Sequence, residues 1–188
     1  GPRRGRGCSS PGGPPADVLS AAVTAALRSA DREHGGFGRQ GPKFPQARRV
    51  DLLMQAYARS GREEPLNVAV ETLDAMTEGG LYDQVGGGFH RYCTDREWTV
   101  PHFEKMLYDN AELARVFLDA HRLLGRPTYA TVAQETLAFL DRELACPDGG
   151  FYGTLDAGSG EGEGEFYVWA PESVAEALAA ADHEFGAD

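Results

Sequence analysis

Residues 79–110 hold the densest group of side chains in the sequence that can bind a ligand or move a proton. The segment GGLYDQVGGGFHRYCTDREWTVPHFEKMLYDN contains two histidines, five carboxylates and several aromatic rings. Imidazoles and carboxyls are the usual groups of general acid–base chemistry, and burial alone does not need so many of them. We predict that any site lies here, among Tyr82, Asp83, Gln84, His90, Arg91, Trp98, His102, Glu104, Lys105, Tyr108, Asp109 and Asn110.

The glycines of this segment indicate a long loop between two helices. Gly79 and Gly80 end an apolar-periodic run, and residues 86–88 allow positive φ or a close approach of the backbone. Long loops without regular structure are uncommon in compact domains and tend to be functional or flexible. The large rings of this loop favour an ordered one, because so much apolar area is normally buried.

Pro101 suits the first turn of a helix, so we predict a helix from there with His102 in its first turn. On such a helix Lys105 and Asp109 form an ordinary i,i+4 pair, and Asn110 enters the apolar face. For this pair a structural role is favoured, and His102 can equally pack or cap the helix without reacting.

Apolar residues recur at helical spacing along most of the remaining sequence. We predict further helices that begin near Asp17, before Val50, near Pro65, near Tyr129 and at Pro171, with residues 166–169 as a short extended piece. The chain is therefore predicted to be almost all α.

A glycine–aromatic motif repeats along the chain as GGFG, GGGFH and GGFYG, each time after a helix. Phe37 and Phe89 are 52 residues apart, and Phe89 and Phe151 are 62 apart. Two helices in each interval indicate helical-hairpin repeats with their long loops around one mouth. About three hairpins do not close a ring, so we predict part of a toroid over residues 17–188, after a linker or cut end over 1–16.

Composition limits the partners. The chain has 188 residues, a net charge of -11 and a pI near 4.9, which disfavours nucleic acid and anionic membranes. No apolar run is long enough for a membrane span, and three cysteines without a CxxC favour reduced thiols and a cytoplasmic location. The run Glu161, Glu163, Glu165 lacks the EF-hand pattern, so we expect a solvated turn, no metal and no cofactor.

Several blocks resemble bacterial YyaL-type proteins and the mammalian spermatogenesis-associated protein 20 family. They are GPKFP, the segment from Gly79 to Asn110 with the following AEL, DGGFYGTLDA and EGEFYVW. The resemblance implies an (α/α)6 toroid of the six-hairpin glycosidase and N-acylglucosamine 2-epimerase kind, joined to a thioredoxin-like domain. This sequence departs from the family in having no CxxC, and Cys93 stands where serine is usual, so no redox role is expected.

The resemblance also implies carbohydrate chemistry by one of two routes. Hydrolysis needs two carboxyl groups, for which Asp83, Asp95, Glu104, Asp109, Asp156 and Glu165 are candidates. Epimerisation needs an acid and a base, for which the sequence offers His90 and His102. The predicted catalytic residues are His90, His102, Glu104 and Asp109. The predicted sugar-binding residues are Lys43, Tyr82, Asp83, Gln84, Arg91, Trp98, Lys105, Tyr108, Asn110 and Asp156, with the rings of Trp98, Tyr82 and Phe151 as stacking platforms.

One alternative is a binding module without catalysis, which uses the same mouth to hold a ligand or the thioredoxin-like domain. A purely structural helical scaffold is a third reading. The aromatic residues of the repeats then act as plugs between hairpins. A Cys93–His90 nucleophile pair is disfavoured because no third group orients it.

Overall fold

The computed structural model describes residues 16–158 and 162–185. Residues 1–15, which make up nearly all of the predicted linker, lie outside this range. The helices are α1 (Ala16–Ser29), α2 (Ala47–Ser60), α3 (Glu63–Glu78), α4 (Leu107–Leu124), α5 (Pro127–Phe139), a π-helical turn η1 (Leu140–Leu144) and α6 (Pro171–Phe185). The strands are β1 (Tyr92–Cys93), β2 (Pro101–His102), β3 (Lys105–Met106) and β4 (Thr154–Leu155).

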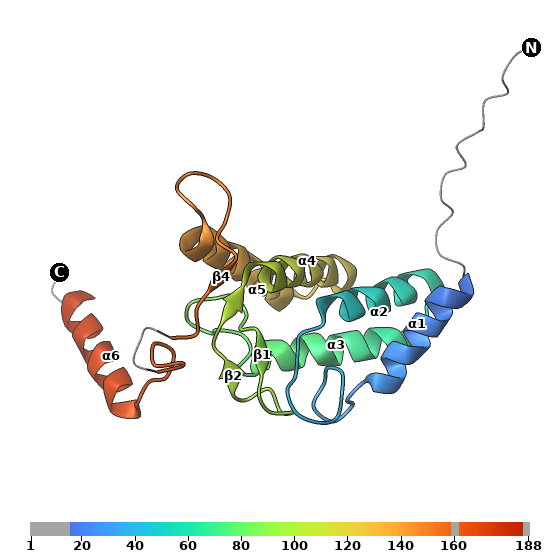
Figure 1. Ribbon diagram of the computed structural model, residues 1–188, viewed down its shortest axis with the longest axis horizontal. Helices are drawn as coiled ribbons and strands as arrows, with labels where there is room; N and C mark the ends of the chain where they lie inside the picture. Colours follow the sequence, from blue (N-terminus) through green and yellow to red (C-terminus); the bar gives the residue numbers. More distant parts are fainter. Residues whose placement is uncertain (1–15, 159–161, 186–188) are drawn as a thin grey trace, which may run out of the picture.

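Helices α2 and α3 form one hairpin, and α4 and α5 form the next (Figure 1). Only two residues link the helices within each hairpin, and Gly61 and Gly125 end α2 and α4 in the left-handed conformation. The long loops lie at the other end of the hairpins. The predicted all-α class and hairpin repeat are confirmed, apart from the four two-residue strands.

The predicted start of the helix after Pro101 is wrong. Pro101 and His102 form β2, which pairs antiparallel with β1 so that His102 lies opposite Tyr92. Lys105 lies in β3, paired with Leu155 of β4, and α4 begins only at Leu107. Backbone pairing between loops outweighs the local preference of Pro101, so Lys105 and Asp109 are not an i,i+4 helical pair. Residues 166–169 form a turn and irregular chain rather than an extended piece.

The repeated glycine–aromatic motif has the same backbone structure each time. A single antiparallel bridge joins Ala30 to Phe37, Tyr82 to Phe89, and Ala145 to Phe151. The loops then pair with one another, the first with the second through Lys43 and Cys93, and the second with the third through β3 and β4. The predicted gathering of the loops at one end is therefore confirmed.

The chain has only two lysines, and both are buried at equivalent places in the first two repeats. The Lys43 ammonium donates to Asp31 at 2.8 Å and to the Gly35 carbonyl at 2.6 Å. The Lys105 ammonium donates to Asp83 at 2.7 Å and to the Gly87 carbonyl at 2.9 Å. Each lysine thus ties its own loop back onto the start of the glycine motif.

The largest buried side chains close the space between the hairpins and the loops. Trp98, Phe89, Phe117 and Tyr129 are at most 1% exposed. The Trp98 ring covers Gly36, where an added Cβ would lie 2.5 Å from the ring, so only glycine fits there.

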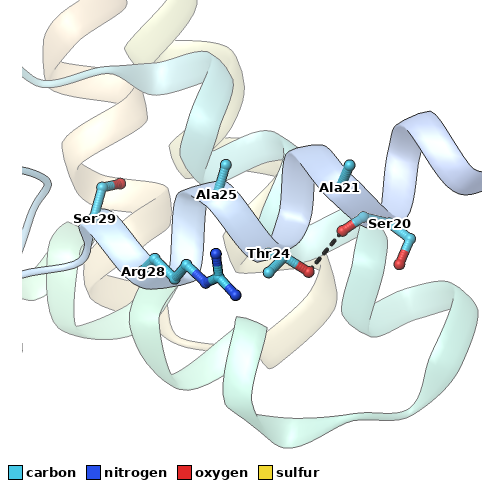
Figure 2. Close-up of a pocket in the computed structure, with 6 residues that line it drawn as sticks. All are labelled: Ser20, Ala21, Thr24, Ala25, Arg28 and Ser29. Atoms are coloured by element: carbon cyan, nitrogen blue, oxygen red, sulfur yellow. Dashed lines mark hydrogen bonds between the residues drawn. The ribbon is translucent and has the colours of Figure 1, made fainter.

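Helix α1 lies at the edge of the array and presents a shallow hollow on its outer side (Figure 2). Small side chains line it, with Thr24 bonded to the Ser20 carbonyl and Arg28 as the charged member. No carboxylate or histidine lines this hollow, so it lacks the groups of acid–base chemistry that the loops carry.

Candidate functional site

Strands β1 and β2, together with the extended segment at Lys43, form a ribbon at the loop end of the hairpins. Lys43 pairs with Cys93, and Tyr92 pairs with His102. Since side chains alternate along a strand, Lys43 and Cys93 face inward, and both are fully buried. The outward face carries Phe44, Tyr92 and His102 in one cross-strand row.

His102 lies in this row and stays accessible, with a quarter of its side chain exposed. Its Nδ1 lies 2.5 Å from Glu163 Oε1, and its Nε2 lies 3.6 Å from Glu104 Oε2. A carboxylate can only accept at Nδ1, so the neutral ring carries its proton there and leaves a lone pair on Nε2. The imidazole is therefore oriented by Glu163 and open at its other nitrogen.

Two carboxyls near Arg91, those of Glu104 and Asp109, have opposite electrostatic environments. Burial alone would raise the pKa of Glu104, but the hydrogen bond from Arg91 at 2.7 Å and its charge outweigh this and lower it. Burial raises the pKa of Asp109 from 3.8 to about 6; the charge of Arg91 opposes this, and the charges of Glu112 and Glu104 add to it. Glu104 thus stays ionised at pH values at which Asp109 is still protonated.

The charged surface continues along the neighbouring helices. Arg48 of α2 pairs with Glu112 of α4 at 2.6 Å, and Arg115 of α4 pairs with Asp51 of α2 at 2.9 Å. These pairs join α2 to α4 beside the ribbon. We call the set formed by Phe44, Arg48, Arg91, Tyr92, His102, Glu104, Asp109, Glu112 and Glu163 the rim.

His90 lies in the interior instead. It is 3% exposed, its Nδ1 lies 3.0 Å from the Phe103 carbonyl, and its ring meets Phe103 and Tyr167 edge to face. Burial, together with the charge of Lys105, lowers the pKa of His90 to about 4, so the ring is neutral near pH 7. The two predicted histidines are thus neighbours of very different accessibility.

Most of the predicted sugar-binding residues are used in internal contacts. Asn110 bonds both backbone groups of Phe89, and the Trp98 indole donates to the His34 carbonyl at 3.0 Å. Tyr82 donates to Glu135, and burial raises its pKa. Lys43 and the Lys105–Asp83 pair are buried as described above.

The remaining predicted residues are accessible. Gln84 donates to the Thr77 carbonyl at 2.7 Å, away from the ribbon, and Asp156 accepts from the Ala157 amide. Tyr108 is 53% exposed and adjoins Arg91. Of the sequence-predicted set, the structure therefore brings together His102, Glu104, Asp109, Arg91 and Tyr108.

The sequence analysis missed Phe44, Tyr92, Arg48 and Glu112, and it assigned Glu163 to a solvated turn. Phe44 follows the buried Lys43, and Tyr92 precedes the buried Cys93. The alternation of buried and accessible side chains around these two residues was the signal that could have indicated Phe44 and Tyr92. The contact of Glu163 with His102 spans 61 residues, and no local pattern indicates it.

No protein-family model matches the chain. The chain is similar to spermatogenesis-associated protein 20 of Mus musculus and of Homo sapiens, each 42% identical over 159 residues, or 79% of this chain. The chain spans a fifth of the length of these curated relatives, 20% in both cases.

Solved structures of (α/α)6 toroids share the fold. Cellobiose 2-epimerase from Spirochaeta thermophila aligns with a TM-score of 0.67 at 24% identity, over 74% of this chain and 39% of that one. A D-mannose isomerase aligns at 0.61 and 14% identity, over 89% and 47%. An unsaturated glucuronyl hydrolase specific for heparin aligns at 0.62 and 9% identity, over 74% and 42%.

Among the described residues, no helix is long and apolar enough to cross a membrane. In the same part of the chain, no three His, Cys, Asp or Glu side chains are grouped so as to hold a metal ion.

Proposed function

Because this chain is 42% identical to spermatogenesis-associated protein 20 over 79% of its length and has the fold of sugar epimerases, isomerases and glycosidases, we propose that its rim binds a sugar and moves a proton on it. The favoured reaction is isomerisation or epimerisation of a reducing sugar. The observation that carries this proposal is His102, fixed at Nδ1 by Glu163 and open at Nε2.

His102 is the proposed base. The lone pair on Nε2 accepts the proton on the carbon next to the sugar carbonyl, and the ring becomes an imidazolium. Glu163 and Glu104 lie on either side of this ring and stabilise the positive charge that it gains. The two carboxylates thus make the His102 imidazole a better proton acceptor.

Asp109 is the proposed acid. A carboxyl with a pKa of about 6 remains partly protonated near neutral pH and can give a proton to the carbonyl oxygen. Arg91, held by Glu104, supplies a fixed positive charge for the oxygen that becomes negative.

Glycoside hydrolysis is a second candidate, favoured by the contrast between Glu104 and Asp109. Two carboxyls whose environments move their pKa values apart are the usual pair of an acid and a base or nucleophile. In that reaction Asp109 protonates the leaving oxygen and Glu104 acts on the sugar carbon or on water.

The test uses the full-length protein with reducing sugars and disaccharides, and product analysis by chromatography. We expect His102→Gln to lower turnover by about a hundredfold or more, since a positioned base typically contributes 10²–10⁴. His121→Gln is the matched control, because His121 lies in the last turn of α4, bonded to the Arg126 carbonyl. Equal turnover by wild type and His102→Gln would contradict the proposal.

A non-catalytic binding module remains the alternative, with a thioredoxin-like domain as its partner. Absence of turnover on every sugar, combined with binding of a separately produced thioredoxin-like domain at the rim, would favour it. Rim variants such as Arg48→Ala would then weaken the domain complex and leave the fold intact.

A further inference from the structure

The outward row of the ribbon ends in an aromatic ring that the proposed reaction does not use. Phe44 stacks on Tyr92 with 4.8 Å between ring centroids, and Tyr92 stacks on His102 with 4.9 Å. These distances match the spacing of neighbouring strands, because the three residues occupy facing positions on the ribbon. The row therefore leads directly to the proposed base.

Phe44 differs from the buried rings of the first two loops. Its side chain is 42% exposed, whereas Phe89 and Trp98 are buried. One face of Phe44 is covered by Tyr92, at an interplanar angle of 28°, and this arrangement fixes the ring. An isolated exposed apolar residue needs no explanation, but a fixed ring at the end of a row that includes His102 provides a rigid platform.

The charges around the row select the kind of molecule that can stack there. Among the described residues, the rim holds three carboxylates, those of Glu104, Glu112 and Glu163, beside the two guanidinium groups of Arg48 and Arg91, and Asp109 adds negative charge as it ionises. Both guanidinium groups are already paired with a carboxylate. An anionic ligand such as a uronate would meet net repulsion, and an uncharged one would not.

We propose that the free face of Phe44, supported from behind by Tyr92, is a stacking subsite for an uncharged pyranose ring at the end of the row away from His102. The apolar face of a pyranose covers the free face of Phe44, and its hydroxyls reach the polar groups of the rim. This inference rests on the proposed function, because it assigns the substrate class of the same site: neutral sugars rather than uronic acids or sugar phosphates.

The subsite is tested by calorimetric titration of the full-length protein with cellobiose, mannose and glucuronate. We expect binding of at least one neutral sugar and weaker binding of glucuronate. Phe44→Leu keeps the apolar bulk but removes the ring, and we expect it to raise the Kd for the neutral sugar about tenfold. Phe44→Trp should bind like the wild type, as should Tyr152→Ala, which removes a 55% exposed ring from the third loop.

The outcomes separate the subsite from the reaction. An unchanged Kd for Phe44→Leu, or tighter binding of glucuronate than of neutral sugars, overturns the subsite alone. Neutral-sugar binding that depends on Phe44, without turnover, supports the subsite and overturns the proposed reaction. No binding of any of the three sugars overturns both. Retained binding by Phe44→Trp shows that a loss in Phe44→Leu is not caused by misfolding.

Discussion

Glu104 and Asp109 are five positions apart in the sequence, yet the fold gives their carboxyls opposite preferences. Arg91 holds Glu104 in its charged form, while Asp109 lies half-buried and accepts no hydrogen bond from a cation of residues 16–158 or 162–185. The unequal sharing of one guanidinium thus creates an acid and a base within a single stretch of chain. This difference predicts a measurable dependence of stability on pH.

Asp109 ionises near 3.8 when unfolded and near 6 when folded. Between these values the folded state keeps the proton and the unfolded state does not, so the free energy of unfolding falls as pH rises from about 4 to about 6. We expect Asp109→Asn to remove about 1 kcal/mol of this fall, a value reduced for solvent screening. Urea unfolding at pH 4 and pH 7.5 measures it.

Asp141→Asn is the matched control, because Asp141 is an exposed carboxyl of η1. Its stability profile should follow that of the wild type. A profile for Asp109→Asn that also follows the wild type would show that Asp109 has no raised pKa.

At the residue scale, the structure brings together only some of the residues that the sequence predicted for the site. His102, Glu104 and Arg91 converge through ion pairs at the rim, and Asp109 lies within reach of the charges of Arg91 and Glu104. Trp98 was expected to stack on a sugar and is instead buried against Gly36. The sequence shows that a ring is present, but not which side of a loop it faces.

At the element scale, the two lysines explain how loops of unequal length hold the same shape. Residues 31 and 43 are 12 apart and residues 83 and 105 are 22 apart, yet each lysine reaches the same aspartate and carbonyl of its repeat. The second loop has ten more residues than the first between its aspartate and its lysine. These additional residues include β1 and most of the segment between β1 and β2.

This arrangement predicts that neither lysine reacts with amine-selective reagents in the folded protein. Lys43 is 0% and Lys105 is 1% exposed, and each ammonium is engaged by a carboxylate and a carbonyl. We expect mass spectrometry to find the α-amino group labelled by an N-hydroxysuccinimide ester, and the lysines labelled only after addition of urea. Rapid labelling of either lysine without urea would contradict the buried placement.

The strands at the loop end were beyond a local reading of the sequence. Pro101 favours a helix start, and nothing near it indicates that its neighbour His102 pairs with Tyr92 ten positions earlier. The helices were predictable because their apolar period repeats within each segment. The strands are only two residues long, and they form because separate loops meet.

At the scale of the whole molecule, the hairpins form an open array from which α6 projects (Figure 1). Residues 171–180 of α6 are all exposed, and a hollow of about 550 Å³ separates the helix from Lys105, Phe139 and Tyr167. The repeat in the sequence predicted the two hairpins, because the first motif precedes α2 and α3 and the second precedes α4 and α5. The sequence could not indicate how α6 would lie, since it has few partners in this chain.

Because α6 is loosely attached, we expect its removal to change the stability of the rest of the fold only slightly. A chain ending at Ala170 keeps Glu163 and Tyr167, and we expect its free energy of unfolding to lie within about 1 kcal/mol of the full chain, since little apolar area is lost. Chemical denaturation of both chains measures this. A loss of several kcal/mol would show that α6 packs on the hairpins.

The central claim is that His102 exchanges a proton with the carbon beside a sugar carbonyl. Proton NMR of the full-length protein with a neutral reducing sugar in D2O tests it directly. We expect loss of the C2 proton signal with the wild type and with His121→Gln, and a rate at least a hundredfold lower with His102→Gln. Undiminished deuterium incorporation by His102→Gln, or none by the wild type with any sugar, would contradict it.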